Sequence, residues 1–259
     1  MSNVGTDIEL INVPHFKEIL KYLPIASNDK EDVMKYLQNI KSLVSINYRY
    51  EQYQFAYFGV HLLYMTYIYC SAWKISSMCE KRYKDATIFA RPYNGKESEF
   101  RESESVFKFS LLPEKDIGKI FHVTGLDAGQ IRQISGFVAD RDDMAHASGK
   151  ISIPNSEEFE TKAKTILTSM SNIHNSMKGL VRKWFGEILV KFSQDSDGDI
   201  DIYENVISDY SLSIKEIAEC DEMSIKGILA KYPSLENELK GYKEDLRDFF
   251  ESYFDVESL

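Results

Sequence analysis

The feature that most constrains the fold is a long run of apolar residues spaced three or four apart between positions 159 and 192. The run comprises Phe159, Ala163, Ile166, Met170, Ile173, Met177, Leu180, Trp184, Ile188 and Phe192. Residues with this spacing lie on one face of an α-helix, so the segment predicts a single long helix with one apolar stripe. A stripe of that length needs partner helices to cover it. We therefore expect an all-α protein built as a helical bundle.

The partner helices are predicted from the segments that precede this run. Good N-cap residues at 27–29 open a helix that continues to about residue 54, and residues 126–148 form another, which Gly149 ends because glycine accepts a left-handed conformation. Residues 91–105 are typical of an exposed loop. The sequence SVFKFSLL, which begins at Ser105, alternates in places and predicts a short strand or an irregular edge.

Residues 55–73 carry no formally charged side chain and resemble a membrane span in length. Four tyrosines run through the segment, and tyrosine favours the membrane interface over the membrane centre. We therefore expect a buried, aromatic-rich helix of a soluble bundle. The N-terminus lacks the basic and apolar regions of a signal peptide, and three cysteines form no disulfide framework. A cytoplasmic protein with reduced thiols, and no membrane partner, is the simplest interpretation.

Charge divides the chain into unequal parts. Residues 193–259 hold 18 acidic and 6 basic side chains, so their net charge is −12, and the preceding residues carry +2 of the total of −10. We predict an N-terminal arm over 1–27, a helical bundle over 28–192 and an acidic helical extension over 193–259. The extension, with its apolar residues near the C-terminus, is expected to dock on the bundle or on a protein partner.

The sequence RDDMAH, from Arg141 to His146, places an arginine, two acids and a histidine in a helix that otherwise has a core-like pattern. Asp142 and His146 are four residues apart and share a helix face, so the carboxylate can orient the imidazole and favour its protonated form. Arg141 and His146 are five residues apart and are not natural hydrogen-bond neighbours within one helix. A joint site therefore needs both side chains to bend toward one cleft, which a second copy of the chain would complete.

This motif resembles the R-x4-6-H signature of HEPN domains (higher eukaryotes and prokaryotes nucleotide-binding), in which a polar residue commonly follows the arginine. The predicted order of helices over about residues 28–192 is also similar to that family. The resemblance implies a homodimer with metal-independent endoribonuclease activity, such as a toxin or an antiviral defence effector. In that interpretation Arg141 binds the scissile phosphate, His146 transfers a proton and Asp142 positions His146, with no cofactor required.

Two other interpretations remain open at this point. HEPN-like domains without nuclease activity serve as binding or scaffold modules, and this chain can be one of them. Alternatively, Arg141 is a partly buried arginine paired with an acid, and His146 interacts with the dipole at the end of its helix. In that case the motif has no function beyond the fold.

Basic residues that alternate with aromatic ones offer a candidate RNA-binding surface. Lys81, Arg82, Lys84 and Arg91 lie among Tyr83, Phe89 and Tyr93. Cations bind phosphates and aromatic rings stack on bases, so this region is predicted to contact RNA. An ordinary solvated helix end explains the same composition equally well.

The acidic segment after residue 192 resembles an EF-hand calcium loop. Its candidate ligands are Asp195, Asp197, Asp199, Asp201 and Glu204. They alternate as oxygen ligands for Ca²⁺ should, and Gly198 stands where the loop turns sharply. Ser193 stands where the family has aspartate, which removes one charged ligand. An acidic linker without a metal is the favoured alternative, and the nuclease chemistry does not require this Ca²⁺.

Overall fold

The computed structural model describes residues 13–27, 32–88, 90–145, 151–194 and 206–220. Within these residues the regular structure is helical, and the β-type pairing is limited to one isolated bridge between Pro24 and Ser213. The α-helices are α1 (Phe16–Leu20), α2 (Asp32–Arg49), α3 (Tyr53–Met78), α4 (Glu80–Thr87), α5 (Glu97–Glu102), α6 (Glu114–Ile117), α7 (Ala128–Ala145), α8 (Ser156–Gln194) and α9 (Ile214–Ile217). The 3-10 helices are η1 (Tyr93–Gly95), η2 (Val106–Leu111) and η3 (Gly118–Thr124). The predicted all-α fold is thus confirmed.

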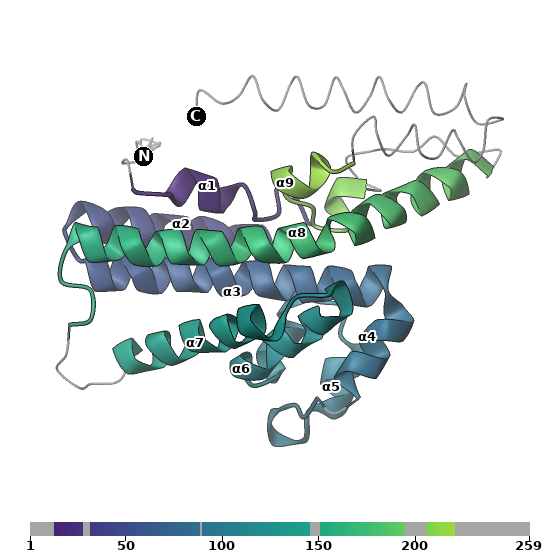
Figure 1. Cartoon of the computed structure of the whole chain (residues 1–259), viewed down its shortest axis with the longest axis horizontal. Helices are drawn as coiled ribbons and strands as arrows, with labels where there is room; N and C mark the ends of the chain where they lie inside the picture. The colour runs from purple at the N-terminus through teal and green to yellow at the C-terminus, as the bar shows by residue number, and fades with distance from the viewer. Residues whose placement is uncertain (1–12, 28–31, 89, 146–150, 195–205, 221–259) are drawn as a thin grey trace, which may run out of the picture.

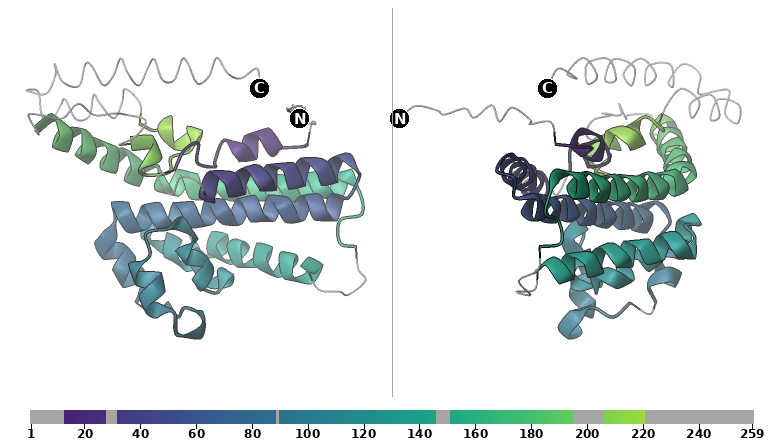
Figure 2. Two further views of the ribbon diagram at one scale, coloured as in Figure 1. Left: turned by 180° about the vertical axis from the view of Figure 1, so that it is seen from behind. Right: turned by 60° about the vertical axis from the view of Figure 1, so that its left-hand side comes forward.

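Three long helices, α2, α3 and α8, lie side by side, and α7 lies on the other side of α3 (Figures 1 and 2). A tight turn joins α2 to α3, with Glu51 in the left-handed region at a φ of 58°. The two helices approach closely at Gly59, where an added Cβ would lie 2.6 Å from Cγ2 of Val44. Glycine is therefore required for this helix spacing.

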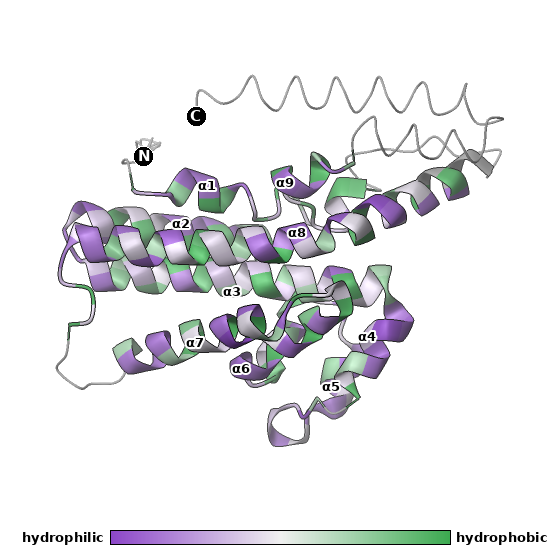
Figure 3. Cartoon of the chain, in the orientation of Figure 1, coloured by the Kyte–Doolittle hydropathy of each residue, from purple (hydrophilic) through white to green (hydrophobic). Residues whose placement is uncertain are grey.

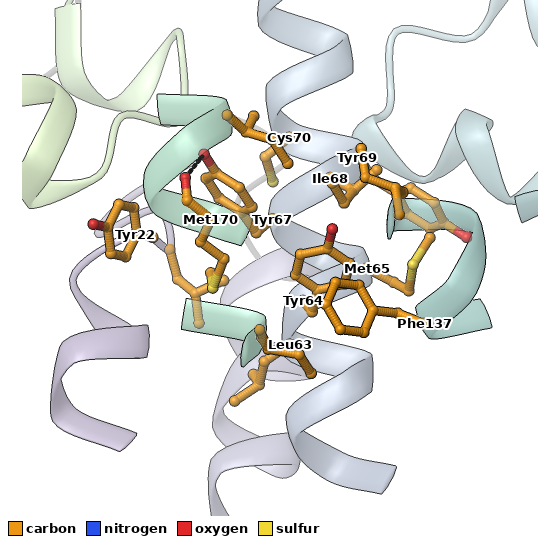
Figure 4. Close-up of a cluster of buried hydrophobic side chains, with 14 of the residues drawn as sticks. Tyr22, Leu63, Tyr64, Met65, Tyr67, Ile68, Tyr69, Cys70, Phe137 and Met170 are labelled. Carbon is orange, nitrogen blue, oxygen red and sulfur yellow. Dashed lines mark hydrogen bonds between the residues drawn. The ribbon is translucent and has the colours of Figure 1, made fainter. Parts of the chain in front are cut away.

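Helix α3 is the central, buried element that residues 55–73 predicted. Two of its buried tyrosines have hydrogen-bond partners within the core. Tyr64 Oη lies 2.9 Å from Ser169 Oγ, and Tyr67 Oη donates to the Met170 carbonyl at 3.0 Å, as Figure 4 shows for Tyr67. These contacts explain how a core helix carries so many phenols, because a buried hydroxyl needs a partner. None of the helices in the described residues, α3 included, combines the length and hydropathy that a membrane span requires.

Helix α8 confirms the prediction from the apolar run. Its stripe from Phe159 to Met177 is buried in the main core, whereas Trp184 and Phe185 belong to a second, smaller core cluster. That second cluster is completed by residues 206–220, which follow the acidic segment in the sequence. The helix therefore joins the bundle at one end to the C-terminal segment at the other (Figure 1).

Residues 106–111 form the 3-10 helix η2, so the predicted short strand is wrong. Ser105 accepts a hydrogen bond from the Phe107 N–H at its start, and Val106 and Phe109 are both buried. Apolar residues three apart share a face of a 3-10 helix, whereas in a strand they would lie on opposite faces. The alternation in SVFKFSLL was too brief to distinguish these two structures.

The described part of the C-terminal extension is fixed to the bundle by buried charge. Lys74 of α3 and Glu216 of α9 form an ion pair with side chains only 1% and 3% exposed. Glu216 also accepts hydrogen bonds from the Ser213 N–H and hydroxyl, both at 2.9 Å. Residues 13–27 of the expected arm also pack on the bundle, with Phe16 and Ile19 buried, and the Ile25 N–H donates to the Leu212 carbonyl of the C-terminal segment at 3.1 Å. Residues 13–27 and 206–220 are thus integral to the folded body.

Candidate functional site

Arg141 lies near the C-terminal end of α7, and its side chain is 22% exposed. Its Nη2 donates to Oε2 of Glu114, the first residue of α6. Its Nε lies 3.1 Å from Oδ1 of Asp142, the next residue in the helix. The guanidinium group therefore sits at the edge of the bundle between two carboxylates, which corresponds to one of the alternatives that the sequence left open.

Glu114 is itself held from the opposite side. Tyr69 of α3 donates to its Oε1 at 3.3 Å, so one carboxylate connects α3, α6 and α7. Burial raises the pKa of the Tyr69 hydroxyl, and the negative charge of Glu114 raises it further. The phenol consequently stays protonated and remains a donor to the carboxylate. This chain of contacts fixes the guanidinium of Arg141 in one place.

Two polar side chains of α3 lie beneath this edge without hydrogen-bond partners in the described residues. They are Tyr57 and His61, both fully buried and one helical turn apart. Burial lowers the pKa of His61 to about 3, and the positive charge of Arg141 contributes, while Asp140 opposes the shift. His61 is therefore a neutral core histidine. Its electrostatic interaction with Arg141 could not be predicted from the sequence, because His61 lies within an apolar run.

His146 lies outside the described residues, since α7 is described only to Ala145. Asp142, its predicted orienting group, is 55% exposed and contacts Arg141. The contact between Asp142 and His146 therefore stays a prediction. The end of α7 is also tied to α8, because Lys162 donates to Oδ2 of Asp140 at 2.5 Å.

The predicted RNA-binding residues are exposed but lie far from Arg141 within one chain. Lys81, Arg82 and Lys84 are on α4, which is largely hydrophilic in Figure 3. Arg141 lies between the levels of His61 and Tyr69 of α3, and α4 begins after Cys79 at the end of that helix. Because an α-helix rises 1.5 Å per residue, these levels and the start of α4 are separated by about 15–27 Å along α3. The structure does not bring these cations to the motif.

Individual contacts also reduce what this basic surface offers to RNA. Lys84 pairs with Glu80 at 2.5 Å, one turn earlier in α4. Burial raises the pKa of Tyr83 to about 12, and its ring packs edge-on against Phe109, so it is not a free stacking platform. Arg91 is exposed in the segment that follows α4.

The five predicted calcium ligands, Asp195, Asp197, Asp199, Asp201 and Glu204, lie outside the described residues. Elsewhere in the part of the chain that the structure describes, no group of three or more His, Cys, Asp or Glu side chains is arranged to hold a metal ion. The calcium site therefore stays a prediction from the sequence pattern.

No protein-family model, curated protein or solved structure matches this chain. The HEPN resemblance accordingly depends on the motif at residues 141–146 and on the all-α arrangement around it. What the described residues add is the local geometry of Arg141: a partly exposed guanidinium, fixed by Glu114 and Tyr69, at the end of the helix that leads to His146.

Proposed function

We propose that the chain is a metal-independent endoribonuclease of HEPN type. The observation that carries the proposal is the placement of Arg141, whose guanidinium is fixed by Glu114 at the bundle edge and whose side chain is 22% exposed. Arginine has five N–H donors, so its contact with Glu114 leaves donors for a phosphate. His146 follows five residues later in the sequence, outside the described residues.

The chemistry needs no metal because RNA supplies the nucleophile. The 2′-hydroxyl oxygen attacks the adjacent phosphorus while His146 takes its proton, and the 5′-oxygen takes up a proton as it leaves. Arg141 stabilises the charge that develops on the phosphorane, and Asp142 holds the imidazole of His146 in position. The products are a 2′,3′-cyclic phosphate and a 5′-hydroxyl.

A second copy of the chain completes the site in this proposal. Large apolar side chains remain exposed where α2 ends and just before α8: Ile46 (49%), Tyr50 (69%) and Ile151 (72%). Apolar residues gathered at one end of a bundle are typical of a surface that another protein covers. Two-fold pairing through this end would place the two motifs near each other.

The ion pair of Arg141 with Glu114 favours a second candidate function, a HEPN-like binding module without catalysis. Two carboxylates, Glu114 and Asp142, already neutralise the guanidinium, and this lowers its attraction for a phosphate. In such a module the motif would recognise RNA or protein, and the RNA would stay intact.

Incubation with RNA in excess EDTA separates the two candidates. The proposed nuclease cleaves RNA under these conditions, and the Arg141→Ala and His146→Ala variants do not. Arg132, exposed on α7, and His122, exposed on η3, provide the matched alanine controls, which should cleave normally. Bound but intact RNA would support the binding module, and equal activity in all four variants would refute the assigned roles.

A further inference from the structure

Where α7 diverges from α3 (Figure 1), the described residues enclose a pocket of about 280 Å³. It is lined by Gln54, Phe55 and Phe58 of α3 and by Met144 and Ala145 of α7. Closer to the middle of the bundle the same interface is filled, because Tyr64 packs edge-on against Phe137. The pocket is thus the open end of the contact between these two helices.

The pocket and Arg141 share one side of α7. Met144 and Ala145 are three and four residues after Arg141, so they lie on the same helix face, about 5 Å further along the axis. On α3, Phe58 lies three residues before His61, and the positive charge of Arg141 helps to lower the pKa of His61. A molecule in the pocket therefore lies about one helical turn from the backbone of Arg141 and next to Ala145, which precedes His146 in the sequence. The guanidinium group itself lies further along α3, where it contacts Glu114.

The lining indicates an aromatic, planar occupant. Two phenyl rings and a thioether form the walls, no charged side chain among the described residues contributes, and Phe55 is 58% exposed. At the rim, Gln54 Oε1 accepts a hydrogen bond from the Ser152 N–H at 2.8 Å, which fixes its amide and leaves the Nε2 donors available. A fixed amide and stacking surfaces, on the face of α7 that also carries Arg141, match a nucleobase that carries a phosphate.

We propose that this pocket binds one unpaired nucleobase of an RNA whose neighbouring phosphate contacts Arg141; the inference deepens the proposed function and rests on it. A base within a duplex is stacked and paired on both sides, so it cannot enter a pocket without unpairing. The pocket therefore restricts the protein to single-stranded RNA or loops. Phe55 provides the principal stacking surface, and Gln54 contacts the edge of the base.

The test measures binding of a fully 2′-O-methylated RNA, which cannot be cleaved by 2′-hydroxyl attack, by fluorescence anisotropy. The wild-type chain should bind a single strand at least tenfold more tightly than the same sequence as a duplex. Phe55→Ala should weaken single-strand binding about tenfold, because a stacked base contributes that much. Phe55→Tyr is the matched control, since it keeps an aromatic ring at the same place in the pocket lining and should bind like the wild-type chain.

Three outcomes overturn the pocket assignment: no preference for a single strand, unchanged binding by Phe55→Ala, or equal weakening by Phe55→Tyr. A change of oligomeric state in Phe55→Ala, measured by light scattering, would also overturn it, because the pocket would then belong to an interface between copies. Cleavage of unmodified RNA is scored separately. If Phe55→Ala cleaves RNA as fast as the wild-type chain, the base-binding pocket is refuted and the proposed nuclease activity is not. If the chain binds single-stranded RNA through Phe55 but does not cleave it, only the nuclease activity is refuted.

Discussion

Replacing Glu216 with glutamine will leave the ammonium group of Lys74 buried without a counter-charge. The two side chains are only 1% and 3% exposed, so water cannot take over the lost interaction. Removing one partner of a buried ion pair typically costs about 3–5 kcal/mol. Since a domain is stable by only about 5–15 kcal/mol, this single change should remove a large part of the free energy of unfolding.

Urea unfolding followed by circular dichroism measures this effect as a shift of the midpoint at constant slope. The matched control is Glu187→Gln, which breaks an exposed pair with Lys183 and should change the midpoint little. Adding Lys74→Met to Glu216→Gln should restore most of the lost stability, because the unpaired charge is then gone. A loss below about 1 kcal/mol, or no recovery in the double variant, would refute the reasoning.

Three further perturbations test other parts of the structure. Glu114→Gln removes the carboxylate that neutralises Arg141, so we expect severalfold tighter binding of 2′-O-methylated RNA in an anisotropy titration. His61 has a pKa of about 3 in the folded chain and near 6.5 when unfolded, so the unfolded state takes up the proton first. Lowering the pH from 7 to 5 should therefore lower the free energy of unfolding, measured in urea, by about 1–2 kcal/mol. In His61→Leu this pH-dependent loss should be absent. Gly59→Ala brings a methyl group against Val44 and should cost about 1–3 kcal/mol in the same assay.

Each of these has its own control. Asp142→Asn removes the other, more exposed carboxylate beside Arg141, and a larger effect there than at Glu114 would contradict the assigned pairing. A pH dependence that His61→Leu leaves unchanged would assign the titration to other groups. Gly136→Ala adds a methyl group where no atom lies within 4 Å, so it should be neutral or stabilising. Equal loss at both glycines would refute the close approach of α2 and α3.

The helices were predictable because their apolar spacing is local in sequence. The stripe from Phe159 onward determined α8, and the aromatic residues of 55–73 determined α3. The same reasoning failed for residues 106–111, because a few alternating residues are compatible with both a strand and a 3-10 helix. Local periodicity is informative only over several turns.

The contacts of the candidate site were not predictable, because they depend on pairs that are distant in sequence. Glu114 meets Arg141 across 27 residues, and Glu216 meets Lys74 across 142. Neither Glu114 nor Glu216 lies in a sequence pattern that predicts its basic partner. The acidic net charge of residues 193–259 did not indicate that residues 206–220 contribute to a core cluster. The buried Glu216 is tolerated there because Lys74 of α3 neutralises it.

The most direct test of the central claim is the chemistry of the RNA ends after incubation with the wild-type chain in excess EDTA. Mass spectrometry of a short single-stranded RNA should show fragments that end in a 2′,3′-cyclic phosphate and begin with a 5′-hydroxyl, and none from its fully 2′-O-methylated counterpart. RNA that stays intact, or fragments that carry 5′-phosphates, would contradict cleavage by Arg141 and His146 through the 2′-hydroxyl.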